Sequence, residues 1–313
     1  METGGMHCLY YSIKRYLNDS GINLTETDVF HLMGGYAFHY HVDPSSAVPY
    51  IQIFGTNMDL NLFLSNTGIE LKLNEETDED KADDELQKVL EADNKHLVYA
   101  NCFYLPFDTL NYQKNYDDHL LYVHAYDSNR LEYIVSDHRS ELVRISKQSF
   151  QMARKKLVYG HHHTLNLNLD TPLPITEIKK NINHLIFEQA KEFSKKAFLY
   201  LVSFSQELEE IDQVEDGVKK ELGFHNISKA LKASHGPIIT RKLMSKSVEE
   251  LDQQLSNKFY TLANLWDAFA NRLVRYTISS NVLLQDLLKE YDKIVSEELY
   301  CANQLQKLLT VTK

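Results

Sequence analysis

Apolar residues recur with two different periods along this chain, and the change falls near residue 172. Before that point, helical spacing alternates with short runs rich in β-branched and aromatic residues, which indicate strands. The Thr-Pro-Leu-Pro segment at 171–174 interrupts the pattern, and apolar residues then recur every three or four positions through 175–213 and 248–309. We therefore expect an α+β fold, with an N-terminal helix and antiparallel sheet in residues 1–172 and a helical bundle in residues 173–313.

A β-hairpin is the clearest element of the first half. Residues 119–127 and 131–137 are rich in strand formers, and the turn formers 128–130 lie between them. A three-residue turn pairs Asp127 with Leu131, and this register places His119 and Asp137 on one face of the hairpin. His124 then faces the other way, near Ile134. An even-numbered turn would move Asp137 to the opposite face.

Cys8 begins a predicted amphipathic helix that carries Leu9, Ile13 and Leu17 on one face. A thiol in the first turn lies at the positive end of the helix dipole, which favours the reactive thiolate. The order of cysteine, histidine and acid along the chain is that of papain-type thiol enzymes. We therefore predict Cys8 as nucleophile, His119 as base and Asp137 as the group that orients the imidazole; the alternative is that Cys8 is a small core residue.

Charge and composition exclude several classes of function for this chain. A net charge of −11 over 313 residues argues against a nucleic-acid surface, and no apolar run is long enough for a membrane span. No signal peptide is evident, so the cytoplasm is the expected location. The three cysteines are too scattered for a disulfide framework or zinc site, and Cys102 is expected in the core. The three consecutive histidines at 161–163 alternate faces in a strand, so they are not predicted to bind one metal ion.

Four blocks of sequence together resemble the butirosin biosynthesis H-type acyltransferase family. They are residues 5–8 (Gly-Met-His-Cys), 34–40 (Gly-Gly-Tyr-Ala-Phe-His-Tyr), 101–107 (Asn-Cys-Phe-Tyr-Leu-Pro-Phe), and 119–127 followed by Asp137. The chain is also similar to papain-like amide synthases that act on carrier-bound chains. The resemblance implies a papain-like domain that moves an acyl group from the phosphopantetheine thioester of a carrier protein, through Cys8, to a small amine in antibiotic biosynthesis.

The same resemblance implies a substrate site. Its expected residues are Gly35, Phe38, Tyr40, Asn101 and Tyr104. No bound cofactor or metal is expected, and the acyl group, the amine and the oligomeric state stay open. The chain departs from papain-type enzymes in one respect, because no glutamine shortly precedes Cys8 to serve as oxyanion donor.

Three alternatives remain open from the sequence. A papain-like peptidase has the same triad order, an N-terminal-nucleophile amidase would require removal of residues 1–7, and a non-catalytic protein could bind the carrier through its helices. Because carrier proteins are generally acidic, we expect docking through a local basic patch. The candidates are the run 154–156 (Arg-Lys-Lys) and Arg241-Lys242 with Lys246.

Overall fold

The computed structural model describes residues 4–92, 95–114, 116, 119–157, 162–279 and 282–311, and the chain divides into two compact units. The first unit contains residues 1–29 and 60–175, and the second contains residues 30–59 and 176–313. The fold is α+β, as the sequence predicted. The expected division at 172/173 differs from these units in two respects, because residues 30–59 group with the helical half and the later boundary falls between residues 175 and 176.

A six-stranded antiparallel sheet forms the centre of the first unit, in the order β3-β8-β4-β5-β6-β7. Its strands are β3 (Glu70–Glu76), β4 (His96–Ala100), β5 (His119–Asp127), β6 (Glu132–Ser136), β7 (Val143–Ser146) and β8 (His162–Asn168). The helices of this unit are α1 (Cys8–Asp19), α3 (Leu60–Thr67), α4 (Glu79–Glu91), α5 (Lys147–Lys155) and the 3-10 turn η1 (Cys102–Tyr104). Helix α2 (Glu26–Leu32) contains the point at which the units divide.

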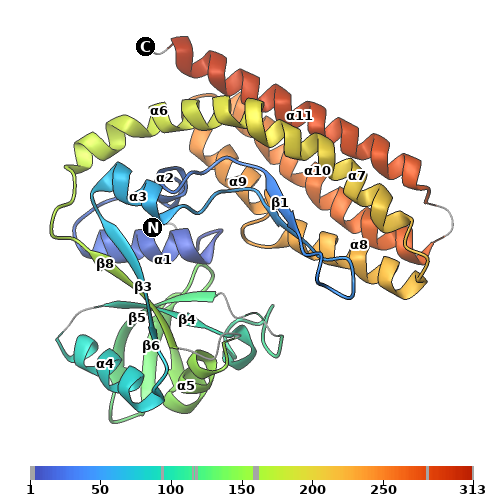
Figure 1. The fold of residues 1–313 in the computed structure, drawn as a ribbon. Coiled ribbons are helices and arrows are strands. Elements are labelled where there is room, and N and C mark those ends of the chain that lie inside the picture. The colour runs from blue at the N-terminus through green and yellow to red at the C-terminus, as the bar shows by residue number, and fades with distance from the viewer. Residues whose placement is uncertain are drawn as a thin grey trace. The chain divides into compact units, whose positions relative to one another are not determined.

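Helix α1 lies against one face of the sheet, and α4 and α5 cover the other (Figure 1). Successive side chains of β5 point to opposite faces of the sheet, which explains this arrangement. The Tyr122 hydroxyl donates to Asp19 of α1 at 2.6 Å, whereas Leu121 and Val123 belong to a buried cluster with Phe150 of α5. The residues of β5 are therefore divided between two apolar layers.

The hairpin of β5 and β6 forms with a turn different from the predicted one. Asp127 pairs with Glu132, so the turn holds the four residues 128–131, and Leu131 adopts a left-handed backbone with φ of 53°. A β-bulge at His124 then shifts the register by one residue, and Val123 pairs with Val135 as a three-residue turn would have paired them. The predicted turn length was wrong, and the bulge compensates for it.

The second unit combines a two-stranded antiparallel hairpin with long helices packed side by side (Figure 1). Its strands are β1 (His39–Val42) and β2 (Ile51–Phe54). Its helices are α6 (Ile175–Glu192), the π-helical turn η2 (Phe193–Ala197), α7 (Phe198–Asp212), α8 (Gly217–Lys232), α9 (Pro237–Val248), α10 (Gln253–Ile278) and α11 (Leu284–Val311). Gly236 and Pro237 open α9, as expected of a turn followed by proline at the first helical position.

A buried ion pair holds residues 30–59 against the helices of the second unit. Arg241 and Glu298 are both fully buried, and the guanidinium Nε donates to Glu298 Oε1 at 2.8 Å. The same guanidinium donates to the carbonyl oxygens of Ala37 and Gly55, at 2.9 and 3.1 Å. The Tyr36 hydroxyl also donates to Glu298, at 2.9 Å. One polar network therefore joins the inserted segment to α9 and α11.

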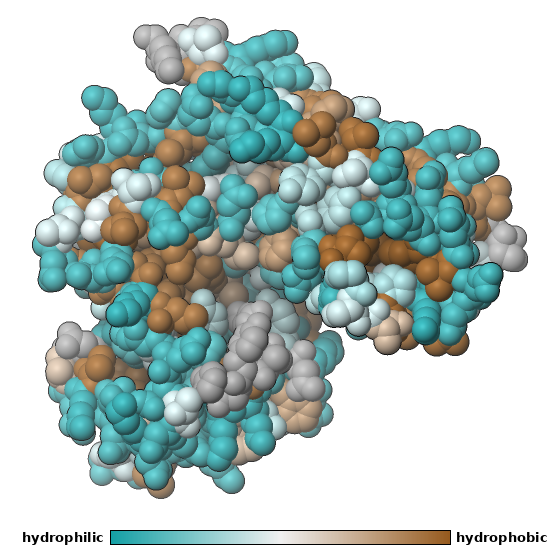
Figure 2. Space-filling view, viewed as in Figure 1, coloured by the Kyte–Doolittle hydropathy of each residue, from teal (hydrophilic) through white to brown (hydrophobic). Residues whose placement is uncertain are grey.

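Each of the two predicted basic runs begins with an arginine that is buried. Arg154 is 2 % exposed beneath α4, and Arg241 is 0 % exposed. Lys155 forms an ion pair with Glu79 at 2.5 Å. Neither arginine can therefore belong to a surface patch, whereas Lys155 and Lys156 are exposed, and docking of a carrier protein at either run stays a prediction. Hydrophilic residues nevertheless cover most of the visible surface, with smaller hydrophobic patches between them (Figure 2).

The described helices include none that is both long and apolar enough to cross a membrane. Of the three consecutive histidines, His161 lies outside the described residues. His162 and His163 are neighbours in β8, so their side chains face opposite ways, as predicted.

Candidate active site

His119 and Asp137 are in direct contact, as strand parity predicted. The imidazole Nε2 lies 2.9 Å from Asp137 Oδ2, and each side chain is 1 % exposed. The other carboxylate oxygen of Asp137 accepts the backbone N–H groups of Arg139 and Ser140, at 2.8 and 2.6 Å. The loop after β6 therefore fixes the carboxylate, and the carboxylate fixes the imidazole.

Cys8 completes this cluster from the start of α1. It is 3 % exposed, and its side chain forms a hydrogen bond with His119. His7 caps the helix, because its Nδ1 accepts the N–H of Leu9 at 3.2 Å. The thiol, the imidazole and the carboxylate therefore lie in the series Cys8, His119, Asp137, which is the arrangement of a nucleophile, a base and an orienting acid.

Two backbone contacts hold the segment before Cys8, and sequence reasoning missed both. The buried carboxylate of Glu26 accepts the N–H groups of Met6 and His7 through the same oxygen, each at 2.8 Å. The N–H of Gly5 donates to the carbonyl of His138, the residue after Asp137, at 2.5 Å. A Cβ on Gly5 would lie 2.5 Å from the Tyr11 ring, so the backbone can pass this close to the ring only because residue 5 is glycine.

The electrostatics of the cluster favour a charged His119. Burial lowers its pKa, but the hydrogen bonds with the side chains of Asp137 and Cys8 outweigh burial and raise it to about 10. Burial raises the pKa of Asp137, yet its contact with His119 more than offsets this and holds the pKa below the ordinary value. The pair therefore behaves as imidazolium and carboxylate at neutral pH.

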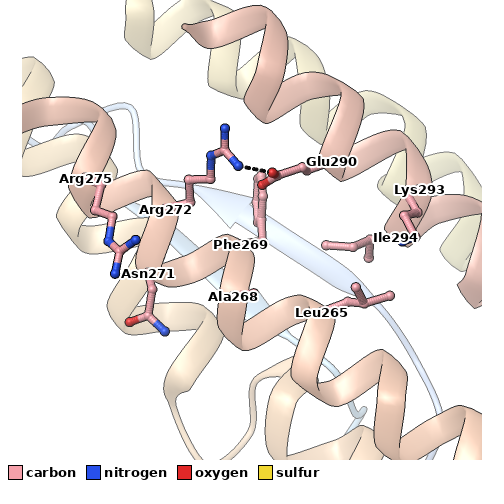
Figure 3. Close-up of a pocket in the computed structure, with 9 residues that line it drawn as sticks. All are labelled: Leu265, Ala268, Phe269, Asn271, Arg272, Arg275, Glu290, Lys293 and Ile294. Carbon is pink, nitrogen blue, oxygen red and sulfur yellow. Dashed lines mark hydrogen bonds and ion pairs between the residues drawn. The ribbon is translucent and has the colours of Figure 1, made fainter. Parts of the chain in front are cut away.

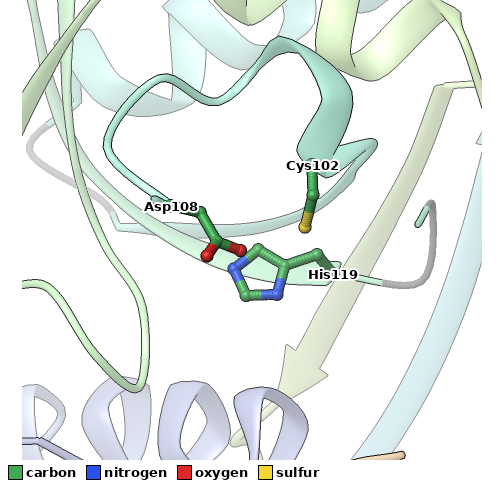
Figure 4. Close-up of side chains that lie close together, drawn as sticks. All are labelled: Cys102, Asp108 and His119. Carbon is green, nitrogen blue, oxygen red and sulfur yellow. The ribbon is translucent and has the colours of Figure 1, made fainter. Parts of the chain in front are cut away.

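A second cysteine and a second aspartate also face His119. Figure 4 shows the sulfur of Cys102 and the carboxylate of Asp108 directed at its ring, and the three ligand atoms lie within 4.8 Å of one another. Asp108 accepts from Asn111 Nδ2 at 2.8 Å and from Arg139 at 3.2 Å. Burial and the carboxylate of Asp108 raise the pKa of Cys102, so this thiol stays protonated.

The two expected substrate residues of the first unit, Asn101 and Tyr104, make contacts within the fold. Asn101 caps η1, with Oδ1 accepting the N–H of Phe103 at 2.9 Å and Nδ2 donating to the carbonyl of Lys156 at 2.8 Å. Tyr104 packs against the Phe103 ring, with centroids 4.9 Å apart. The polar atoms of Asn101 are therefore already occupied.

The other expected substrate residues belong to the second unit. Gly35 has no room for a side chain, because a Cβ would lie 2.5 Å from Gln189 Oε1. Phe38 stacks on Trp266 with centroids 5.5 Å apart, and the Tyr40 hydroxyl lies 2.9 Å from Ser203 Oγ. These contacts all lie within the second unit, and the predicted position of the three residues next to Cys8 stays a prediction.

A pocket of about 450 Å³ lies between α10 and α11 in the second unit (Figure 3). An ion pair between Arg272 and Glu290 crosses it. None of its nine lining residues is a cysteine or histidine. This pocket therefore offers no thiol or imidazole, and the pairing of a thiol with an imidazole is found instead at the Cys8 cluster.

Comparison with known families gives a match for residues 7–138, to the family described as Butirosin biosynthesis protein H, N-terminal. Cys8, His119 and Asp137 all fall within the matched residues. No curated protein matches the chain. The family resemblance deduced from the sequence is therefore confirmed for this part of the chain.

Proposed function

We propose that the chain is a papain-like acyltransferase of antibiotic biosynthesis, because residues 7–138 match the family described as Butirosin biosynthesis protein H, N-terminal. In this proposal Cys8 takes an acyl group from the phosphopantetheine thioester of a carrier protein and passes it to an amine. The observation that carries the proposal is the buried contact of His119 with both Asp137 and the Cys8 side chain.

The first half-reaction forms an acyl-enzyme. His119 holds the proton of Cys8, and the thiolate attacks the thioester carbonyl. The tetrahedral intermediate collapses with loss of the pantetheine thiolate, which takes the proton from His119. Exchange of one thioester for another keeps the acyl group activated.

The second half-reaction consumes the acyl-enzyme. The amine attacks the Cys8 thioester, its proton passes to neutral His119, and the Cys8 thiolate leaves as the amide forms. Asp137 holds the imidazole in the required tautomer and stabilises the imidazolium. Burial of Cys8, His119 and Asp137 favours transfer over hydrolysis, since water is excluded from the thioester.

Intact-protein mass spectrometry with an acyl-pantetheine thioester tests the proposal. We expect wild-type protein and Cys102→Ala to gain the acyl mass, whereas Cys8→Ala gains none. Because the groups of a triad act as a unit, turnover in Cys8→Ala should fall by at least about 10³-fold.

An added amine distinguishes the possible reactions. Release of the acyl group as an amide supports acyl transfer, while release as the free acid at the same rate with and without amine would show a hydrolase. Acylation of Cys8→Ala would refute covalent catalysis by Cys8.

A further inference from the structure

Strand β8 carries a row of polar side chains where an interior strand normally carries apolar ones. His162, Thr164 and Asn166 alternate along it and therefore share one face. Strand β8 lies between β3 and β4, and Thr164 pairs with Asn74 on one side and Val98 on the other. Val98 belongs to the buried cluster beneath α4 and α5, so the polar row faces the same layer. Interior strands are usually rich in Val, Ile and Leu.

A pocket of about 420 Å³ opens on this polar row. Strands β3, β4 and β8 and helices α4 and α5 contribute its lining. Its inner residues include His96, Arg154, His162 and Asn166. The pocket lies entirely within the first unit.

Three polar atoms that line this pocket are buried without a hydrogen-bond partner among the described residues. They are Arg154 Nε, His162 Nδ1 and Asn166 Oδ1. Arg154 is 2 % exposed, and its Nη1 donates a long hydrogen bond of 3.5 Å to the carbonyl of Ala82. The carboxylate of Asp83 lies near enough to interact with the Arg154 charge, but it is paired with Lys147 at 2.9 Å. A buried guanidinium with unused donors is costly, because its desolvation is only partly compensated.

The lining of the pocket carries as many acidic as basic side chains, and Arg154 is the buried one among the basic side chains. Burial and the nearby guanidinium lower the pKa of His96 to about 4, and the same causes lower the pKa of His162, so both imidazoles are neutral at pH 7. At the rim, Lys81 forms ion pairs with Glu76 and Glu85. Among the lining residues Arg154 is the buried cation, and its Nη1 donates to a backbone carbonyl rather than to a carboxylate.

We propose that this pocket binds a small organic carboxylate that also carries a hydroxyl or amino hydrogen. The carboxylate accepts from Arg154 Nε, and the hydroxyl or amino group donates to Asn166 Oδ1. A single buried cation matches a monovalent carboxylate better than a doubly charged phosphate. The pocket is separate from the His119 cluster. His96, which lines the pocket, is the first residue of β4, and Ala100, which pairs with His119, is its last, so about 13 Å of extended strand lies between them.

Thermal unfolding of the full chain in sodium L-lactate, sodium propionate or sodium chloride at equal ionic strength tests the proposal. Lactate and propionate differ by one hydroxyl group. We expect lactate to raise the unfolding midpoint of the wild type more than propionate does, because a ligand that binds the folded state stabilises it. Sodium phosphate serves as the second probe and should raise the midpoint less than lactate.

Three variants complete the test. Arg154→Met should show no rise in unfolding midpoint in lactate or propionate. Without ligand, its midpoint should be at least that of the wild type, because the substitution removes the desolvation cost of a buried guanidinium. Asn166→Leu should respond equally to lactate and propionate. Lys155→Met is the matched control, since it removes a charge from the same helix at a residue that does not line the pocket, and it should respond like the wild type.

Equal midpoints of the wild type in lactate and chloride would overturn the proposal. So would an Arg154→Met protein that keeps the lactate response. A large loss of stability in ligand-free Arg154→Met would identify Arg154 as a structural cation instead.

Discussion

Cys8 and Cys102 both lie beside His119, yet their surroundings assign them different chemistry. Cys8 forms a hydrogen bond with His119, the imidazole that also contacts Asp137 and that serves as base in the proposed reaction. Cys102 instead forms a hydrogen bond with the carboxylate of Asp108, and a neighbouring anion favours the thiol. The sequence predicted Cys102 as a core residue. Its place in the buried apolar cluster confirms this, although the contact with Asp108 was not predicted.

The raised pKa of His119 makes stability depend on pH. A histidine whose folded-state pKa is about 10 contributes stability that is complete below pH 6.5 and is lost as pH rises toward 10. We therefore expect the free energy of unfolding to fall over this range by up to about 1.4 kcal/mol per pH unit from His119. Asp137→Asn should flatten this fall, because it removes the charge that stabilises the imidazolium.

Urea unfolding at a series of pH values measures this effect. Asp127→Asn is the matched control, since Asp127 lies at the far end of the same hairpin and contacts Arg144 rather than His119. Identical pH slopes for wild type and Asp137→Asn would rule out this role of Asp137.

At the level of elements, the hairpin of β5 and β6 shows which features a sequence pattern can predict and which it cannot. The sequence predicted strands over 119–127 and 131–137, because β-branched and aromatic residues are bounded by turn formers, and the structure has strands over 119–127 and 132–136. The turn length was not, because Leu131 takes a left-handed backbone that usually indicates glycine or asparagine. The bulge at His124 has no local signal either. The longer turn and the bulge shift the register by one residue in opposite directions, so the predicted contact between His119 and Asp137 still forms.

The two histidines of β5 have different partners, and we assign them separate roles. His124 Nε2 lies 2.7 Å from Ser136 Oγ, and burial lowers its pKa to about 4, so it is a neutral structural group. His124→Ala should lower the free energy of unfolding by about 1 kcal/mol through loss of this hydrogen bond and still acylate Cys8. His119→Ala should prevent acylation.

Acyl-enzyme yield by mass spectrometry, with unfolding in urea as the measure of stability, separates the two variants. Loss of acylation in a folded His124→Ala protein would contradict the assignment.

For the whole chain, the sequence predicted the helical second half but not the inserted segment that packs with it. Residues 30–59 follow a short helix and resemble the rest of the first half, so periodicity alone does not assign them to either unit. Their assignment rests on Arg241 and Glu298, whose burial depends on a partner 57 positions away. Local pattern cannot distinguish such a pair from surface charges, which explains why Arg241 was wrongly predicted as part of a basic patch.

This ion pair should dominate the stability of the second unit. Glu298→Gln leaves the guanidinium without its counter-charge and should cost about 3–5 kcal/mol of unfolding free energy. Changing both partners, to Arg241→Met with Glu298→Leu, should recover part of that loss, since no buried charge then remains.

Chemical denaturation of the single and double variants checks this expectation. Lys258→Gln with Glu297→Gln removes a partly exposed pair of the same charges and should change stability by less than about 1 kcal/mol. A Glu298→Gln protein as stable as the wild type would show that the buried pair contributes little.

The network around Glu298 also sets the order in which the second unit can be completed during synthesis. Tyr36 leaves the ribosome early, whereas its hydrogen-bond acceptor Glu298 is made 262 residues later. At bacterial or eukaryotic elongation rates this interval is on the order of tens of seconds. The nascent segment 30–59 must spend that time without its final partner, so the second unit is completed only after α11 has emerged.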